Sequence, residues 1–76
     1  MESKLIEFIK KDILEDSEIN IEPATKLISS GIIDSFSLVL LQTFIKKEFG
    51  KKILAPRITA ESFNSVTQMI EVINRF

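Results

Sequence analysis

Three stretches of this 76-residue sequence repeat apolar residues at the spacing of an α-helix, which restricts the chain to a helical fold. Each amphipathic helix must bury its apolar face against another element, so we predict a small all-α bundle. The apolar faces are Leu5, Ile6, Ile9 and Ile13 in residues 4–15, Leu38, Leu41, Ile45 and Phe49 in residues 35–49, and Val66, Met69, Ile70, Ile73 and Phe76 in the last helix.

Capping residues indicate where these helices begin and end. Ser3 and Asp34 are placed to accept from free backbone N–H groups at the starts of the first and second helices. Gly50 tolerates the left-handed conformation and should end the second helix. Ser65 opens the last helix in a capping-box pattern, with Gln68 three residues later.

The connections between the helices differ in length. Residues 16–33 show no sustained period, contain Pro23 and end near a turn at Gly31, so they form a long first loop with scattered apolar anchors. Thr59 is placed to cap a single turn over residues 59–63, TAESF, which we count as a short third helix. We therefore predict one domain, residues 1–76, with three main helices, a short third helix and a long first loop.

Composition excludes several classes of function. The chain has no cysteine and no histidine, which removes the usual zinc sites, cysteine nucleophiles and histidine bases. Ten basic residues against eleven acidic ones give a net charge of −1, so the sequence gives no support to nucleic-acid binding. It shows no secretion signal and no stretch of membrane-spanning length, and a cytoplasmic protein is the default expectation.

The pair Asp34-Ser35 has two interpretations. Taken alone, it is typical of helix capping, because such side chains satisfy donors that have no partner within the helix. No constellation of nucleophile, base and orienting group accompanies it, so we do not expect an enzyme.

The wider segment GIIDSFSLVLLQTFIKKEFG, residues 31–50, resembles the phosphopantetheine attachment segment of the acyl carrier protein superfamily. In that family, a glycine-led turn precedes Asp-Ser and a bulky apolar residue, and an apolar helix ending in Phe-Gly follows. The matching positions are Gly31, Asp34, Ser35, Phe36 and Phe49-Gly50. The order of the remaining helices also fits, so the resemblance covers essentially the whole chain and implies an acyl-carrier-protein-like four-helix bundle.

The resemblance implies a carrier that holds an acyl or aminoacyl group as a thioester and delivers it between enzymes of a biosynthetic pathway. Ser35 would be the attachment residue for 4′-phosphopantetheine, which a separate transferase moves from coenzyme A. Asp34 would support the serine and contribute to a Mg²⁺ site during loading. A helix start suits a phosphodiester because its free N–H groups and dipole favour negative charge. Members of this family act as monomers between enzymes.

The second helix departs from carriers of fatty-acid synthesis, which place a row of acidic residues there. Leu40, Lys46 and Lys47 stand where acids are frequent. The segment GIIDS instead resembles carriers that work with adenylating enzymes, such as D-alanine carriers. Partners would then be a phosphopantetheinyl transferase, an adenylating enzyme and a downstream acyltransferase or synthase.

Four residues are candidate partner contacts: Phe36, Leu40, Thr43 and Lys47. Leu40 has two interpretations, either packing under the first loop or forming an apolar contact with Phe36 beside Ser35. The adjacent lysines are also typical of a solvated face. The alternative function is a cofactor-free helical interaction module, because the wide apolar arc of the second helix could dock a partner helix.

Overall fold

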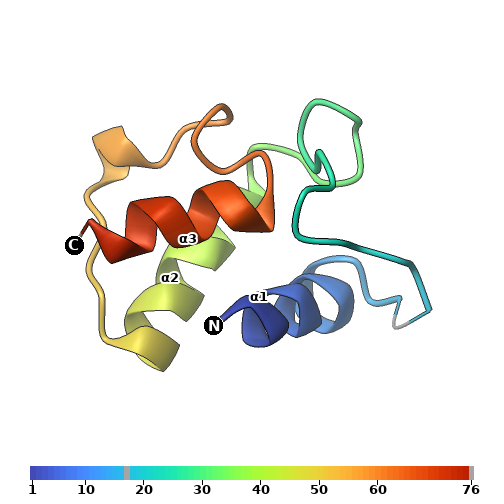
Figure 1. The fold of residues 1–76 in the computed structure, drawn as a ribbon, viewed down its shortest axis with the longest axis horizontal. Helices are drawn as coiled ribbons and strands as arrows, with labels where there is room; N and C mark the ends of the chain where they lie inside the picture. Colours follow the sequence, from blue (N-terminus) through green and yellow to red (C-terminus); the bar gives the residue numbers. More distant parts are fainter. Residues whose placement is uncertain (17, 76) are drawn as a thin grey trace.

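The computed structural model describes residues 1–16 and 18–75, and Figure 1 shows their path. The described residues form no β-strand and contain three α-helices, α1 (Glu2–Phe8), α2 (Ser37–Phe49) and α3 (Val66–Asn74). A π-helical turn, η1 (Ile9–Ile13), continues α1, and a short 3₁₀ helix, η2 (Ala55–Arg57), lies between α2 and α3. The prediction of a small all-helical fold is confirmed.

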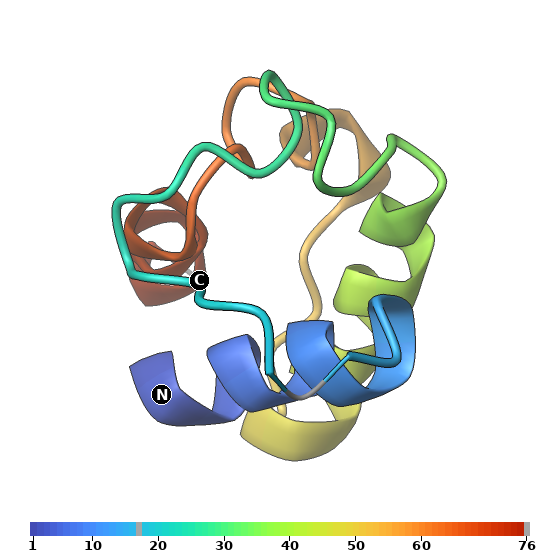
Figure 2. The ribbon, with the colours of Figure 1, turned by 90° about the vertical axis from the view of Figure 1, so that its right-hand side faces the viewer.

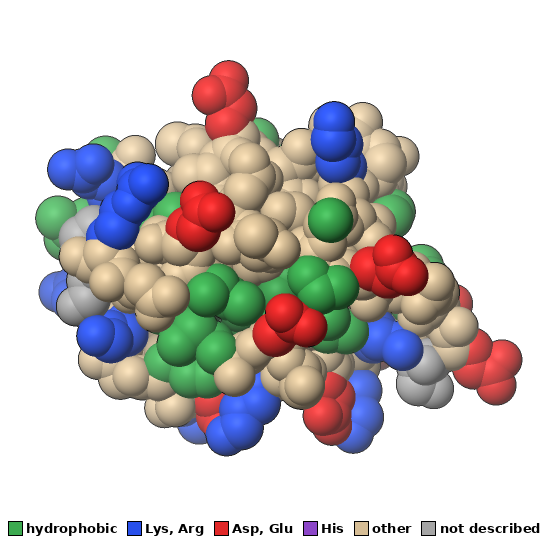
Figure 3. All heavy atoms as spheres, in the orientation of Figure 1, with side chains coloured by type: hydrophobic (Ala, Val, Ile, Leu, Met, Phe, Trp, Pro, Cys, Tyr) green, Lys and Arg blue, Asp and Glu red, His purple; other side chains and the backbone are tan. Residues whose placement is uncertain are grey.

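The helices enclose one apolar core. Figure 2 shows α2 and α3 on opposite sides of the molecule, with α1 across one end. The core also includes Ile21, Leu27 and Ile33, so the long first loop packs onto the bundle as its apolar anchors predict. Its remaining members are Leu5, Ile9, Leu38, Leu41, Ile45, Ile53, Phe63, Val66, Met69, Val72 and Ile73. In Figure 3, further hydrophobic side chains fill the seam between α3 and α1.

The first helix differs from its prediction at both ends. It begins at Glu2, and Met1 is its N-cap residue without a side-chain hydrogen bond, so the predicted cap at Ser3 is wrong. Its last turn widens, because the N–H of Leu14 bonds the carbonyl of Ile9, five residues back. Glu15 then adopts a positive φ of 52°, which ends the helical segment.

The second helix starts two residues later than predicted, at Ser37 rather than Ser35. The N–H groups of Ser37 and Leu38 bond the carbonyls of Asp34 and Ser35 in i→i+3 fashion, so a tight turn precedes the α-helix. At the other end, Gly50 has φ 68° and ends the helix in the left-handed conformation, as predicted.

The third helix begins as predicted, and Ser65 accepts from the N–H of Gln68 at 3.2 Å. The predicted single turn at residues 59–63 is confirmed, and the hydroxyl of Thr59 accepts from the N–H of Ser62 at 3.0 Å, as expected of its cap. This turn does not extend into the regular short third helix that the resemblance implies. One i→i+4 bond, from the N–H of Phe63 to the carbonyl of Thr59, closes that turn and is not continued. So few residues cannot offset the cost of nucleating a helix. The predicted apolar residue Phe76 lies outside the described residues.

None of the helices described here combines the length and the apolar character needed to cross a bilayer.

Candidate functional site

The turn Asp34–Ser37 joins the long loop to α2. It contains two serines, Ser35 and Ser37, which lie in different environments. Ser37 is buried, and its N–H and hydroxyl lie 3.2 and 3.3 Å from Oδ1 of Asp34. The Asp34 carboxylate therefore caps this turn, which precedes the helix. The N-cap residue of α2 itself is Phe36, which makes no side-chain cap bond, so Asp34 is not the N-cap of the helix as predicted. Ser35, the candidate attachment residue, is exposed and its hydroxyl makes no hydrogen bond within the described residues.

The backbone around Ser35 is also open to a ligand. In the described part of the chain, the N–H groups of Ser35 and Phe36 donate no hydrogen bond, because they precede the first i→i+3 bond of the turn. Such N–H groups at the positive end of a helix suit a phosphate oxygen. The site thus offers a free hydroxyl and free donors on a turn held in place by Asp34.

Large exposed apolar side chains gather near this serine. Of the five in the described residues, Phe36, Val39 and Leu40 lie on the solvent-facing side at the start of α2. Phe36 is the most exposed, at 83%. Leu54 belongs to the segment after α2, which is held against that helix by a 2.8 Å bond from Nε2 of Gln42 to the carbonyl of Ile53. These four side chains are called the apolar patch below.

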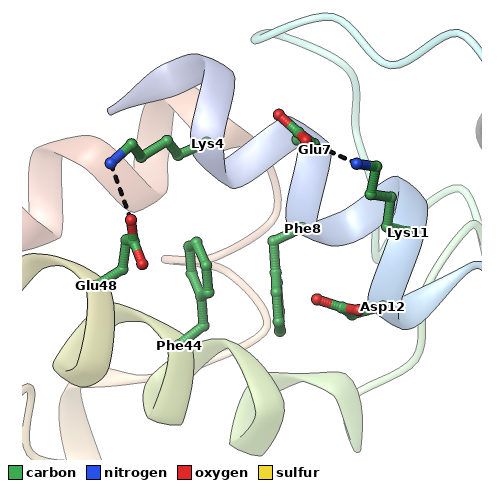
Figure 4. Close-up of a pocket in the computed structure, with 7 residues that line it drawn as sticks. All are labelled: Lys4, Glu7, Phe8, Lys11, Asp12, Phe44 and Glu48. Atoms are coloured by element: carbon green, nitrogen blue, oxygen red, sulfur yellow. Dashed lines mark hydrogen bonds and ion pairs between the residues drawn. The ribbon is translucent and has the colours of Figure 1, made fainter.

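A groove of about 290 Å³ lies between α1 and α2 (Figure 4). Its floor is a stacked pair, Phe8 and Phe44, whose ring centroids are 4.1 Å apart. An ion pair of 2.8 Å between Lys4 and Glu48 links the two helices at one end. The hydrogen bond from Lys4 to Glu48, followed by the attraction between the charges, raises the pKa of the Lys4 ammonium.

The predicted partner contacts divide into two groups. Leu40, Thr43 and Lys47 line one hollow beside α1, together with the Phe8–Phe44 pair. Phe36 does not line that hollow, and its side chain is exposed to solvent. Leu40 is 50% exposed, which excludes the interpretation that it is buried under the first loop.

A metal site is not preformed around the serine. Asp34 is the only acidic residue between positions 23 and 47. No group of three or more potential metal ligands occurs in the part of the chain that the structure describes. A Mg²⁺ ion bound through Asp34 would need its other ligands from phosphates, waters or a second protein.

Comparison with known proteins gives one detailed match. No family model and no curated protein matches the sequence. A chain from a crystal structure described as that of an FAD-dependent dehydrogenase has 36% sequence identity and a TM-score of 0.79, and the match covers 92% of this chain and 99% of that chain. At this identity and coverage, the two chains share a fold and belong to one family.

Two contributors to the site were missed by sequence reasoning. Val39 lies four residues before Thr43 on the solvent face of α2, so helical spacing could have identified it. Leu54 follows the helix in an aperiodic segment, and only the bond between Gln42 and the Ile53 carbonyl brings it close to α2. No signal in the sequence indicates that contact.

Proposed function

We propose that this protein is a carrier, with a 4′-phosphopantetheine arm on Ser35 that holds an acyl or aminoacyl group as a thioester. The observation that supports this proposal is the exposed, unbonded hydroxyl of Ser35 at the start of α2. In this proposal, the single turn at residues 59–63 takes the place of the short third helix of acyl carrier proteins. The fold would then be a carrier bundle with one element reduced to a turn.

Loading is a phosphoryl transfer carried out by a separate transferase. The Ser35 oxygen forms a bond to the coenzyme A phosphorus nearest the pantetheine, and the pyrophosphate P–O bond breaks. Adenosine 3′,5′-bisphosphate leaves with the bonding electrons, and the serine proton passes to a base of the transferase. The carrier supplies the nucleophile and two N–H donors that suit the new phosphodiester.

The attached arm supplies the thiol that the chain itself lacks. The thioester chemistry belongs to this cofactor and to the enzymes that act on it. Phe36, Val39 and Leu40 surround the attachment point with an apolar surface that a partner enzyme can cover. The proposal therefore assigns this chain the roles of presenting the arm and being recognised.

The direct test is loading followed by mass measurement. The protein is incubated with coenzyme A, Mg²⁺ and a broad-specificity phosphopantetheinyl transferase. We expect the mass of one phosphopantetheine group to be added to the wild type and none to Ser35→Ala, with Ser37→Ala as the matched control that still accepts the group. Absence of addition to the folded wild type, or equal addition to Ser35→Ala, would leave the cofactor-free interaction module as the better proposal.

The similar chain also suggests a class of partner. It matches this protein over nearly its whole length, and such a small helical fold has no βαβ units of the kind that bind dinucleotides. The crystal structure that contains the similar chain is described as that of an FAD-dependent dehydrogenase. A flavin dehydrogenase acting on the carried group is thus a candidate partner here.

Such a partner would oxidise the cargo while it remains on the arm. The FAD of such a dehydrogenase would supply the two-electron acceptor for this oxidation, and this chain would only present the cargo. Incubating the acylated carrier with the dehydrogenase of that crystal structure should yield a cargo two hydrogens lighter, and no such change with a correctly loaded carrier would exclude this partner.

A further inference from the structure

The segment from Ser35 to Arg57 differs in charge from the rest of the chain. Residues 35–57 contain five basic residues and one acidic residue, which are Lys46, Lys47, Lys51, Lys52, Arg57 and Glu48. The remainder of the chain contains five basic residues and ten acidic ones. The overall charge of −1 therefore hides a strong separation of charge along the chain.

The single acidic residue in this stretch does not neutralise its lysines. The Glu48 carboxylate pairs with Lys4 of α1 at 2.8 Å. Lys46 and Lys47 are exposed on the last turns of α2, and neither forms an ion pair with any residue that the structure describes. Their charges are therefore available to a partner.

The apolar patch and the lysines share one side of α2. Lys46 and Lys47 follow Val39 and Leu40 by seven residues, or about two turns, which places each pair on the same face of the helix. The bond between Gln42 and the Ile53 carbonyl holds the following segment, with Lys51, Lys52 and Leu54, back against α2. The exposed side chains of α2 are thus apolar near Ser35 and basic near the end of the helix. Phe36, Val39, Leu40, Lys46 and Lys47, with Lys51, Lys52 and Leu54 of the following segment, are called the α2 face below.

We propose that the α2 face docks a partner protein with an apolar pocket beside a group of carboxylates. Apolar contact would supply the buried centre of the interface, and the lysines would steer and orient the partner. This inference rests on the proposed carrier function, because such a partner must reach Ser35. An anionic membrane would also attract the lysines, but it would cover the apolar patch and with it the serine that enzymes must reach.

The test uses two designed helical peptides with the same Leu/Phe face. One peptide carries glutamates beside that face, and the other carries lysines at the same positions. Each is titrated into isotope-labelled protein while the backbone amide signals are followed. We expect the acidic peptide to shift the signals of Phe36, Val39, Leu40 and Leu54, to bind more weakly as salt rises, and to bind better than the basic peptide.

Charge-reversal variants sharpen this test. The double variant Lys46→Glu/Lys47→Glu should weaken binding of the acidic peptide by about tenfold or more. The matched control Lys10→Glu/Lys26→Glu changes two lysines outside the α2 face and should bind within about twofold of the wild type. Equal binding of the two peptides, or equal loss in the two double variants, would overturn the proposal.

Two further measurements separate the alternatives. If the protein sediments with phosphatidylglycerol vesicles but does not bind the acidic peptide, the α2 face binds a membrane surface and not a protein partner. The Ser35→Ala variant should bind the acidic peptide as the wild type does, because the hydroxyl is not part of the apolar or basic contacts. Loading by the transferase is measured separately, so failure of the docking proposal and failure of the carrier proposal give different results.

Discussion

The starts of α2 and α3 are similar in sequence but differ in structure. A polar residue followed by a serine precedes each helix. The pair is Asp34-Ser35 before α2 and Asn64-Ser65 before α3. Ser65 is buried and caps its helix through the N–H of Gln68. Ser35 is exposed and caps nothing among the described residues.

The polar residues before the two serines explain this difference. Asn64 faces away from its own helix, and its side-chain oxygen accepts from the N–H groups of Ile28 and Ser29 at 2.9 and 3.0 Å. Capping of α3 is therefore left to Ser65. Asp34 instead turns toward Ser37 and caps its own turn, which leaves Ser35 without a structural role. The comparison shows how a helix start can keep its cap and still present a serine to solvent.

Exchanging each serine for alanine gives the largest expected contrast. Ser35→Ala should abolish loading with phosphopantetheine and leave the free energy of unfolding unchanged within about 0.5 kcal/mol, because the side chain makes no contact that the fold needs. Ser65→Ala should lower that free energy by about 1 kcal/mol through loss of the cap, while loading continues. Mass spectrometry and urea unfolding of both variants measure the two effects.

A result in which both variants load, or both lose stability equally, would mean that the two helix starts are equivalent. The capping interpretation of Asp34-Ser35 would then explain the sequence without any attached group.

The link between α3 and the long loop should be the next most sensitive feature. Asn64→Ala leaves two backbone N–H groups without their acceptor and should cost about 2 kcal/mol of the free energy of unfolding. Hydrogen exchange at Ile28 and Ser29 should become faster. Asn64→Asp keeps the accepting oxygen and loses only the bond to the Ser29 hydroxyl, so it should retain most of the slow exchange. Unchanged exchange in Asn64→Ala would show that this link does not hold the loop.

At the start of α2, two variants separate capping from charge. Asp34→Asn keeps an oxygen that can accept from Ser37, whereas Asp34→Ala removes it, and we expect only the alanine variant to lose about 1 kcal/mol of stability. If Asp34 also contributes to a Mg²⁺ site during loading, both variants should load more slowly because both lack the carboxylate. Rates of loading are compared at several Mg²⁺ concentrations. If Asp34→Asn is loaded at the wild-type rate, Asp34 caps the turn and does not contribute to a Mg²⁺ site.

Sequence periodicity predicted most of the buried residues of α2 and α3, because packing against one core imposes a helical repeat on them. Phe49 and Ile70 are only partly buried, and the buried Val72 was missed. Leu38, Leu41 and Ile45 are buried as expected, and Gly50 ends α2 because its missing Cβ allows a positive φ. The exact start of α2 was not predictable in this way, since an i→i+3 turn and an α-helical turn accept the same residues at Asp34 and Ser35.

Contacts between distant residues left no pattern in the sequence. Asn64 was not singled out from the sequence, yet its side-chain oxygen accepts from backbone N–H groups 35 and 36 positions earlier in the chain. The candidate serine was identified from its neighbours in the chain because its setting is local. The excess of basic residues in positions 35–57 can be read from the sequence, but the bond that holds the segment after α2 against that helix is seen only in the structure.

The smallest expected effect lies on α1, at an exposed ion pair. Lys11 donates a 2.9 Å hydrogen bond to Glu7, and this bond, with the attraction between the charges, lowers the pKa of the Glu7 carboxyl from its ordinary value of 4.5. A carboxyl with a lowered pKa in the folded state stabilises the fold above its ordinary pKa and loses this contribution as the pH falls through the folded value. Because both side chains are exposed, the contribution is small and screened by salt.

Glu7→Gln should therefore melt slightly below the wild type at neutral pH, with the gap closing well below pH 4.5 and at high salt. Glu61→Gln, which removes an exposed carboxylate on the turn before α3, is the matched control for the change in net charge. Melting temperatures across a pH series would show the difference between the two variants. If they lose the same stability at every pH, the effect comes from net charge alone, and the Glu7–Lys11 pair contributes nothing to the fold.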